Sequence, residues 1–290
     1  MRMLSIIKQF ENKPNQKRLQ LLLTLLRKHK LPFTTESYSF GHEGKNVIID
    51  FGKGKNEIVI TSHHDLFPGS AGANDNASTI PVLLSLALHL QKHKPRNSIK
   101  IIFFGNEEQD CVGSRAYVRR HGIKNIKSVI SLELVGAGEF VALWPISPKV
   151  KDSKTFKLIT DLLKKKKVQF DSAESVPAFF SDYEPFRSAG LSDSFALTMI
   201  PKNQVEEVRA FAAGLRLKSF GILRYPLYYI YMYARVFRFM WKAFTRRLKI
   251  PLLFQRYHDK EDKSIYLSEK TLQVVGRLVK NILQELDSGL

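Results

Sequence analysis

The chain has 290 residues, of which 44% are hydrophobic and 25% are charged, as is ordinary for a folded protein with one large α/β domain or two smaller ones. Its 46 Lys and Arg residues against 27 Asp and Glu residues give a net charge of +19. This charge favours anionic partners such as nucleic acid, an acidic membrane face or acidic substrates, without choosing among them. The single cysteine, Cys111, excludes an internal disulfide framework and a cysteine-based metal site.

The N-terminal segment has a short apolar run that meets Lys8. The run is too short for the core of a signal peptide and lacks a small-residue cleavage site, so we expect a cytoplasmic protein. The first thirty residues predict one helix, because Leu19, Leu22 and Leu26 recur at helical spacing. Arg18 is assigned to the solvent-facing side of this helix.

Beyond residue 40 the pattern alternates between strands and helices. Apolar runs predict strands at 46–51, 57–61, 99–104, 128–132 and 195–200, and helical spacing predicts helices at 77–90, 114–121, 156–165 and 268–286. Alternation of this kind is typical of an α/β fold with a mixed, mostly parallel central sheet and helices on both faces.

Histidine and carboxylate side chains follow three of the predicted strands. The strand at 57–61 is followed by His63, the next strand by Glu107 and Glu108, and the third by Glu133. Ligands of open α/β sheets bind beyond the carboxyl ends of the strands. We therefore expect these side chains to meet at one edge of the sheet.

His63 and Asp65 occupy alternate positions at an extended strand end, so both side chains face the same way. His63 is a candidate metal ligand, and Asp65 is a candidate for the carboxylate that orients its imidazole and raises its basicity. His64 faces the other way and is assigned either a structural role or a role in supporting the ligands.

Asp75 is the candidate for a carboxylate that bridges two metal ions. It lies in the sequence Gly-Ala-Asn-Asp-Asn at 72–76, where small residues allow close approach of the backbone. A co-catalytic site needs such a bridge between ions about 3.5–4 Å apart. The alternative is that Asp75 only caps the helix that follows.

The remaining acids are costly to place in apolar surroundings unless a cation compensates them. We interpret Glu108 as a metal ligand and Glu107 as a general base, with a solvated acidic turn as the alternative. Glu133 lies between apolar residues, which favours a nearby cation. His258, considered alone, has the setting of a surface histidine.

In combination these motifs resemble the family of co-catalytic zinc aminopeptidases, which includes bacterial leucyl aminopeptidases and, more distantly, glutamate carboxypeptidase and glutaminyl cyclases. The resemblance covers roughly residues 15–200 and 255–287 and implies a zinc-exopeptidase fold. The matches follow the family order: His-x-Asp at 63–65, Gly-Ala-x-Asp-Asn at 72–76, Glu-Glu and Gly-Ser within 107–114, Ser-Asp-Tyr at 181–183, and Tyr-His at 257–258.

The resemblance implies two zinc sites that share Asp75. One zinc ion takes His63, Asp75 and Glu133, and the other takes Asp75, Glu108 and His258. Glu133 stands where many aminopeptidases have Asp, so one bound ion is kept as an alternative to two.

The resemblance also implies the catalytic roles. Glu107 takes a proton from the water that bridges the metals and passes it to the leaving amine. Tyr257 matches a tyrosine that donates to the tetrahedral oxyanion in some members.

A stretch at about 203–256 differs in composition from the rest of the chain. No acidic residue occurs between Glu207 and Asp259, and Arg and Lys alternate with Tyr, Phe and Trp. Residues 220–256 are interpreted as a cationic helix on an anionic membrane surface or as a lid or homo-oligomerisation element. Nucleic-acid binding is the less favoured third alternative.

We therefore predict one catalytic domain spanning residues 1–290, with the basic aromatic stretch as an insertion. Its predicted function is that of a zinc-dependent aminopeptidase that hydrolyses N-terminal residues of peptides, cytoplasmic or attached at the periphery of a membrane. The alternatives are a glutaminyl-cyclase-like acyltransferase with a single zinc ion, and a membrane-surface or partner-binding protein on a peptidase scaffold. A membrane-surface or partner-binding protein on this scaffold should lack a metal ligand or the general base, and the sequence lacks neither.

Overall fold

The computed structural model describes residues 2–173, 180–210 and 251–289. Its strands are β1 (Thr34–Phe40), β2 (His42–Phe51), β3 (Glu57–His63), β4 (Ser98–Phe104), β5 (Ile126–Glu133), β6 (Phe140–Trp144), β7 (Phe170–Ser172) and β8 (Ser194–Ile200). Its α-helices are α1 (Met3–Phe10), α2 (Asn15–Lys28), α3 (Thr79–Lys92), α4 (Val112–His121), α5 (Pro148–Lys151), α6 (Lys154–Lys165), α7 (Glu184–Ser188), α11 (Leu252–Arg256) and α12 (Glu269–Gly289). Short turns of other helix types are η1 (Ala73–Ala77), η2 (Glu107–Gln109), η3 (Lys202–Gln204) and η4 (Ser264–Tyr266).

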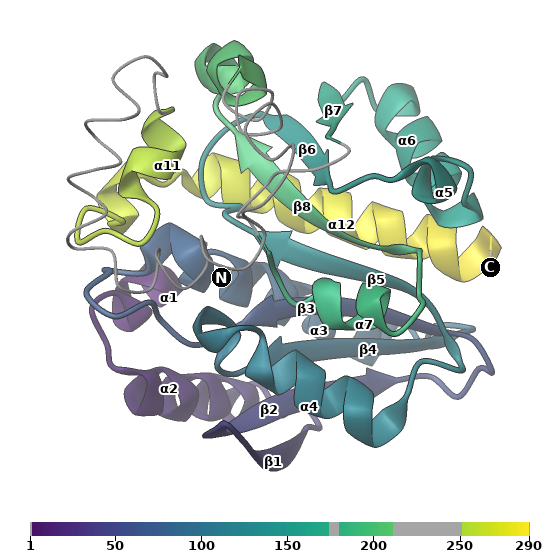
Figure 1. Ribbon diagram of the computed structural model, residues 1–290, viewed down its shortest axis with the longest axis horizontal. Coiled ribbons are helices and arrows are strands. Elements are labelled where there is room, and N and C mark those ends of the chain that lie inside the picture. The colour runs from purple at the N-terminus through teal and green to yellow at the C-terminus, as the bar shows by residue number, and fades with distance from the viewer. Residues whose placement is uncertain (1, 174–179, 211–250, 290) are drawn as a thin grey trace, which may run out of the picture.

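The strands form one sheet in the order β1-β2-β4-β3-β5-β8-β6-β7 (Figure 1). Its centre is parallel, because β3 pairs in parallel with β4 and β5, and β5 pairs in parallel with β8. At one side β1 and β2 are antiparallel, and at the other β6 runs antiparallel to β8. The predicted mixed, mostly parallel sheet is confirmed.

Helices cover both faces of the sheet, as predicted (Figure 1). On one face, α1, α2, α3, α6 and α12 bury a large apolar cluster against strand residues that include Ile101 and Phe103. On the other face, α4 and α7 pack against a smaller cluster that includes Ile102 and Phe104. Successive residues of β4 thus alternate between the two cores, which explains why this strand reads as an unbroken apolar run.

The predicted single N-terminal helix is wrong, because the structure has two helices there, α1 and α2. Asn12 lies in the left-handed region with a φ of 57°, and Pro14 is the N-cap of α2. Proline has no amide hydrogen to donate within a helix interior, so the chain ends one helix and starts another. The solvent-facing placement of Arg18 is also wrong, because its side chain is fully buried.

The other predicted elements are confirmed, with small shifts at their ends, and Ser268 caps α12 by accepting a hydrogen bond from the amide of Thr271. The sequence did not predict β1, β6 and β7. β1 is an edge strand whose described side chains are mostly exposed, so it carries no apolar signal.

Part of the basic aromatic stretch is described. Residues 202–204 form η3, residues 205–210 are helical, and α11 precedes His258. Residues 211–250 lie outside the described part of the chain. The interpretations of 220–256 therefore concern mainly undescribed residues, and the single-domain assignment stays a prediction. Within the described ranges, no helix has the length and apolar character needed to cross a membrane.

Replacing Phe103 by Ala is expected to lower the free energy of unfolding by about 3–5 kcal/mol, because its fully buried ring fills the larger core. Urea unfolding followed by tryptophan fluorescence measures this loss. Ile265→Ala is the control, since Ile265 is 70% exposed and its replacement should change stability by less than about 0.5 kcal/mol. Equal effects of the two substitutions would contradict this assignment of the core.

Candidate functional site

The predicted site residues converge at the carboxyl edge of the parallel strands. His63 is the last residue of β3 and Glu133 is the last residue of β5. Glu107 and Glu108 lie in η2, which follows β4. Because β3, β4 and β5 are parallel neighbours, these ends meet at one edge, as expected.

Asp75 and His258 reach this edge from outside the sheet. Asp75 lies in η1, and the peptide bond that follows it is cis. It is not the cap of α3, because the residue in that position is Ser78. His258 follows α11 in a turn with a φ of 57°.

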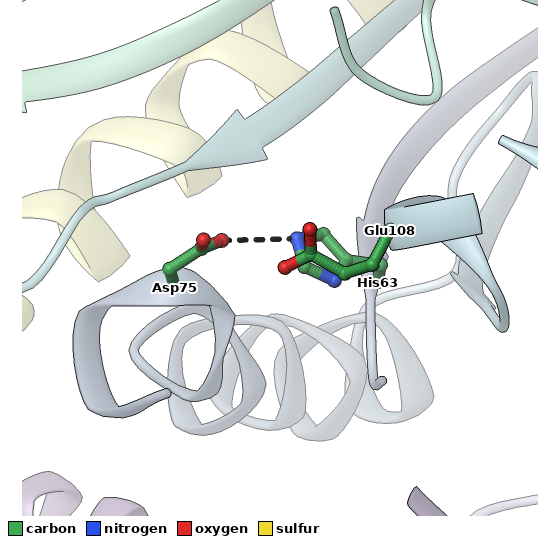
Figure 2. A group of neighbouring side chains, drawn as sticks. All are labelled: His63, Asp75 and Glu108. Carbon is green, nitrogen blue, oxygen red and sulfur yellow. Dashed lines mark ion pairs between the residues drawn. The ribbon is translucent and has the colours of Figure 1, made fainter. Parts of the chain in front are cut away.

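One half of the site consists of His63, Asp75 and Glu133. The Nε2 atom of His63 lies 3.2 Å from Oδ1 of Asp75 and 3.6 Å from Oε2 of Glu133. Figure 2 shows the imidazole of His63 and the carboxylate of Asp75 pointing toward each other, with Glu108 beside them.

The other half consists of Asp75, Glu108 and His258. The Nε2 atom of His258 lies 3.2 Å from Oδ2 of Asp75 and 2.9 Å from Oε2 of Glu108. The two oxygens of Asp75 therefore face different imidazoles, one in each half of the site.

The donor atoms fit a metal centre. Single donor atoms of His63, Asp75 and Glu108 all lie within 4.8 Å of one another, and all three side chains are buried. Among the described residues, Oε1 of Glu108 has no hydrogen-bond partner, and Oδ2 of Asp75 has only its contact with Nε2 of His258. Buried carboxylate oxygens are costly without a partner, and imidazole with carboxylate is a donor set that zinc accepts.

Asp65 connects both sides of the site through one carboxylate. Its Oδ1 lies 3.3 Å from Nδ1 of His63 and accepts a hydrogen bond of 3.2 Å from the amide of Glu107. Its Oδ2 accepts a hydrogen bond of 3.1 Å from the amide of Glu108. The orientation of the imidazole and the position of η2 are thus fixed by the same buried group.

Glu133 is held by three polar side chains. Asn76 donates to its Oε2 at 2.6 Å, and Ser131 donates to its Oε1 at 3.1 Å. The hydroxyl of Ser181 also donates to Oε1. These contacts fix the orientation of the Glu133 carboxylate, whose Oε2 lies near His63.

His258 and Asp75 are held by aromatic rings and by a buried carboxylate, respectively. The rings of Phe67 and Tyr257 stack on the imidazole of His258, with centroid distances of 4.0 and 3.7 Å. The carboxylate of Asp262 accepts hydrogen bonds from the amides of Asn74 and Asp75, each of 2.9 Å. The structure therefore places Tyr257 against a candidate ligand, and its predicted role toward an oxyanion stays a prediction.

The imidazoles have raised pKa values in these acidic surroundings. Burial acts to lower the pKa of His258, but Glu108 and Asp75 raise it to about 10. Burial has the same effect on His63, and the neighbouring carboxylates, Glu107 first among them, raise its pKa well above the ordinary value. The raised pKa values have a common cause in the buried carboxylates, which a bound divalent cation would compensate in place of protons.

The pKa of Glu107 is also raised well above its ordinary value. Burial is the main cause, and the charges of Glu108 and Glu133 add to it against the opposing effect of His63. A carboxyl group with a raised pKa can both accept and return a proton. Asp182 behaves similarly: burial raises its pKa to about 8, although it accepts a hydrogen bond of 2.6 Å from Ser114.

A pocket of about 210 Å³ opens beside these residues, and His63, Asp75, Glu107 and Glu133 line one end. Alternate residues of two strands line its apolar part: Phe140, Ala142 and Trp144 of β6, and Thr198 and Ile200 of β8. Further apolar lining comes from Leu134, Phe180, Val205, Val208, Leu253 and Phe254.

The sequence patterns predicted no role for several residues that hold the site together. Ser131 could have been found, because it lies two positions before Glu133 on the same strand face. Asn76 and Ser181 lie inside the matched motifs, but their contacts with Glu133 depend on the fold. For Asp262, the only signal in the sequence was its closeness to the candidate ligand His258.

Comparison with known proteins gives a family match over most of the chain. Residues 46–283 match peptidase family M28. The aminopeptidase YwaD of Bacillus subtilis is 30% identical over 169 residues, which are 56% of this chain and 37% of that protein. The vacuolar membrane protease of Candida glabrata is 33% identical over 109 residues, which are 37% of this chain and 12% of that protein. The chain thus spans well under half the length of these curated relatives.

Solved structures share the fold. A zinc aminopeptidase from Bacillus subtilis has a TM-score of 0.60 at 20% identity and covers 84% of this chain and 50% of its own. The glutaminyl cyclase of Porphyromonas gingivalis has a TM-score of 0.67 at 16% identity and covers 98% of this chain and 97% of its own. At these identities the likeness concerns the fold alone.

The resemblance seen in the sequence motifs is confirmed by these comparisons. The matched region contains β3, β4 and β5 and every predicted metal ligand. From this match and the sheet that carries the site, we conclude that the chain belongs to peptidase family M28.

Proposed function

We propose that this chain is a zinc-dependent aminopeptidase that removes N-terminal residues from peptides. The observation that carries the proposal is the position of Asp75, whose two oxygens face His63 and His258 at 3.2 Å each. A carboxylate with one oxygen in each of two ligand sets is suited to bridge two ions.

In this proposal, one ion is held by His63, Asp75 and Glu133, and the other by Asp75, Glu108 and His258. Bound ions of this kind polarise the scissile carbonyl and lower the pKa of the attacking water. Asp65 orients His63 and carries the backbone of η2, so it contributes to both ligand sets.

Glu107 is the proposed general base. It lines the pocket, and its Oε2 atom lies 3.9 Å from Nε2 of His63 without being part of either ligand set. Its amide is held by Asp65, which fixes the start of its side chain. Glu107 can therefore take a proton from the attacking water and return it to the leaving amine.

The pocket supports a substrate whose terminal side chain is large and apolar. Its walls from β6 and β8 offer apolar surface, and the indole of Trp144 is oriented by a hydrogen bond of 2.9 Å to Thr198. Among the described pocket residues, the guanidinium of Arg209 is already paired with Asp171 and Glu206. Both ion pairs are exposed, so Arg209 does not decide which end of a peptide is bound, and action at the amino end is proposed from the resemblance of the motifs.

A glutaminyl-cyclase-like activity is the alternative that the same fold allows. Zinc content separates the two, since the aminopeptidase is expected to bind two ions for each chain and the cyclase one. Cytoplasmic localisation stays a prediction, as does peripheral attachment to a membrane; the names of the fungal relatives concern a vacuolar membrane.

The test of this function is a panel of aminoacyl anilides and an N-terminal glutaminyl peptide, assayed after chelation and readdition of zinc. We expect cleavage of leucyl and phenylalanyl anilides and no cleavage of N-acetylated versions, which lack the free amine. Cyclisation of the glutaminyl peptide with one zinc ion for each chain would contradict the proposal.

Ala142→Phe tests the pocket in the same assay, because the larger side chain fills the space between the walls. We expect kcat/KM for leucyl and phenylalanyl anilides to fall about 10–100-fold, and that for alanyl anilide to change by less than about threefold. Ala189→Leu is the matched control, since Ala189 is exposed and does not line the pocket. An equal loss for all three substrates would show that the pocket does not select the side chain.

Glu107→Gln should lower kcat by at least about 100-fold, because the amide cannot accept the proton. The zinc content, measured by atomic absorption, should equal that of the wild-type protein, since Glu107 is assigned to neither ligand set. Retained turnover would exclude Glu107 as the base, and loss of zinc would make it a ligand instead.

A further inference from the structure

Arg18 is a buried cation beneath the metal centre. It lies in the first turns of α2, and its side chain has no exposed surface. Arginine is almost never fully buried unless its charge and its donors are compensated. The groups that compensate Arg18 therefore indicate what the residue does.

The guanidinium donates to backbone carbonyls of three separate segments. Nε donates to the carbonyl of His64 at 2.8 Å, and Nη1 donates to the carbonyls of Gly72 at 3.1 Å and Phe10 at 3.3 Å. His64 directly follows the candidate ligand His63, and Gly72 begins the loop that leads to Asp75. The planar guanidinium has its donors in fixed directions, so it sets the spacing of these two segments.

The loop leading to Asp75 packs directly on Arg18. Gly72 has a φ of 65°, and a Cβ atom at this position would lie 2.8 Å from Nη1 of Arg18. On the other end of the same loop, Asp262 accepts the amide hydrogens of Asn74 and Asp75. Arg18 and Asp262 therefore hold successive parts of the segment 72–75, one as a cation and the other as a carboxylate.

The charge of Arg18 matters as well as its shape. Burial lowers its pKa to about 10, and the carboxylates of Asp65, Asp75, Asp262 and Glu108 act in the opposite direction. The guanidinium thus stays charged at neutral pH. Among the described residues it forms no ion pair within 4.0 Å, and its buried Nη2 has no hydrogen-bond partner. Arg18 therefore acts on these acids at longer range, while Nε and Nη1 bind the backbone.

We infer that Arg18 is a positioning residue of the metal centre, which sets the distance between His63 and Asp75 by holding the carbonyls of His64 and Gly72. Arg18 lies outside residues 46–283, the range that matches the family. The inference rests on the proposed function, because it assumes that His63 and Asp75 bind metal.

The test compares Arg18→Met and Arg18→Lys with Lys17→Met in the full-length protein. Zinc affinity is measured by competition with a chromogenic chelator, and geometry by the absorption spectrum of the cobalt-substituted protein. Lys17 is exposed on the same helix, so its variant makes the same change of charge without touching the site.

We expect Arg18→Met to weaken zinc binding about 10–100-fold and to alter the cobalt spectrum, as loss of groups that support metal ligands does. Arg18→Lys keeps the charge but cannot hold two carbonyls in fixed directions, so it should weaken binding about tenfold. Lys17→Met should stay within about twofold of the wild-type protein.

Unchanged zinc affinity and an unchanged cobalt spectrum in a folded Arg18→Met protein would overturn the inference, even if its thermal stability is lower. If that variant does not fold, Arg18→Lys decides, and wild-type affinity in it would show that charge alone is needed. A wild-type protein that binds no zinc would instead refute the proposed function, which is a separate and recognisable result.

Discussion

The site depends on one carboxylate that faces two ways. Asp75 has one oxygen near His63 and the other near His258, so both halves of the site meet at a single side chain. Glu108 and Glu133 complete the two sets, which places three buried acids around two imidazoles. Such a cluster is costly without cations, and much of the surrounding structure serves to hold it in place.

Two buried carboxylates hold the loops of candidate ligands that lie outside the sheet, and both do so by accepting hydrogen bonds from backbone amides. Asp65 accepts the amides of Glu107 and Glu108, and Asp262 accepts those of Asn74 and Asp75. In each case a buried carboxylate fixes two consecutive peptide groups, one of which belongs to a candidate ligand. His63 and Glu133 lie at strand ends, so pairing with neighbouring strands fixes their backbone, and the contacts of Asp65 and Asn76 act on their side chains.

This division explains what the sequence could predict. Strand ends and alternate positions on a strand are local patterns, so His63, Asp65 and Glu133 could be placed at one edge from the sequence. The residues that hold irregular segments act across the fold: Asp262 lies 187 positions from Asp75, and Arg18 lies 54 positions from Gly72. Helical periodicity identified apolar residues of α2 that join the main core, but it could not show that Arg18 of the same helix contacts the carbonyls of His64 and Gly72.

The pocket and the acidic cluster depend on each other through the sheet. Alternation along β6 directs Val141 and Leu143 into the main core and leaves Phe140, Ala142 and Trp144 to line the pocket. Glu107 lines the same pocket, and burial is the main cause of its raised pKa. If Glu107 is the base and the pocket binds the substrate side chain, as we propose, then both roles belong to one pocket whose apolar wall follows from the alternation along β6.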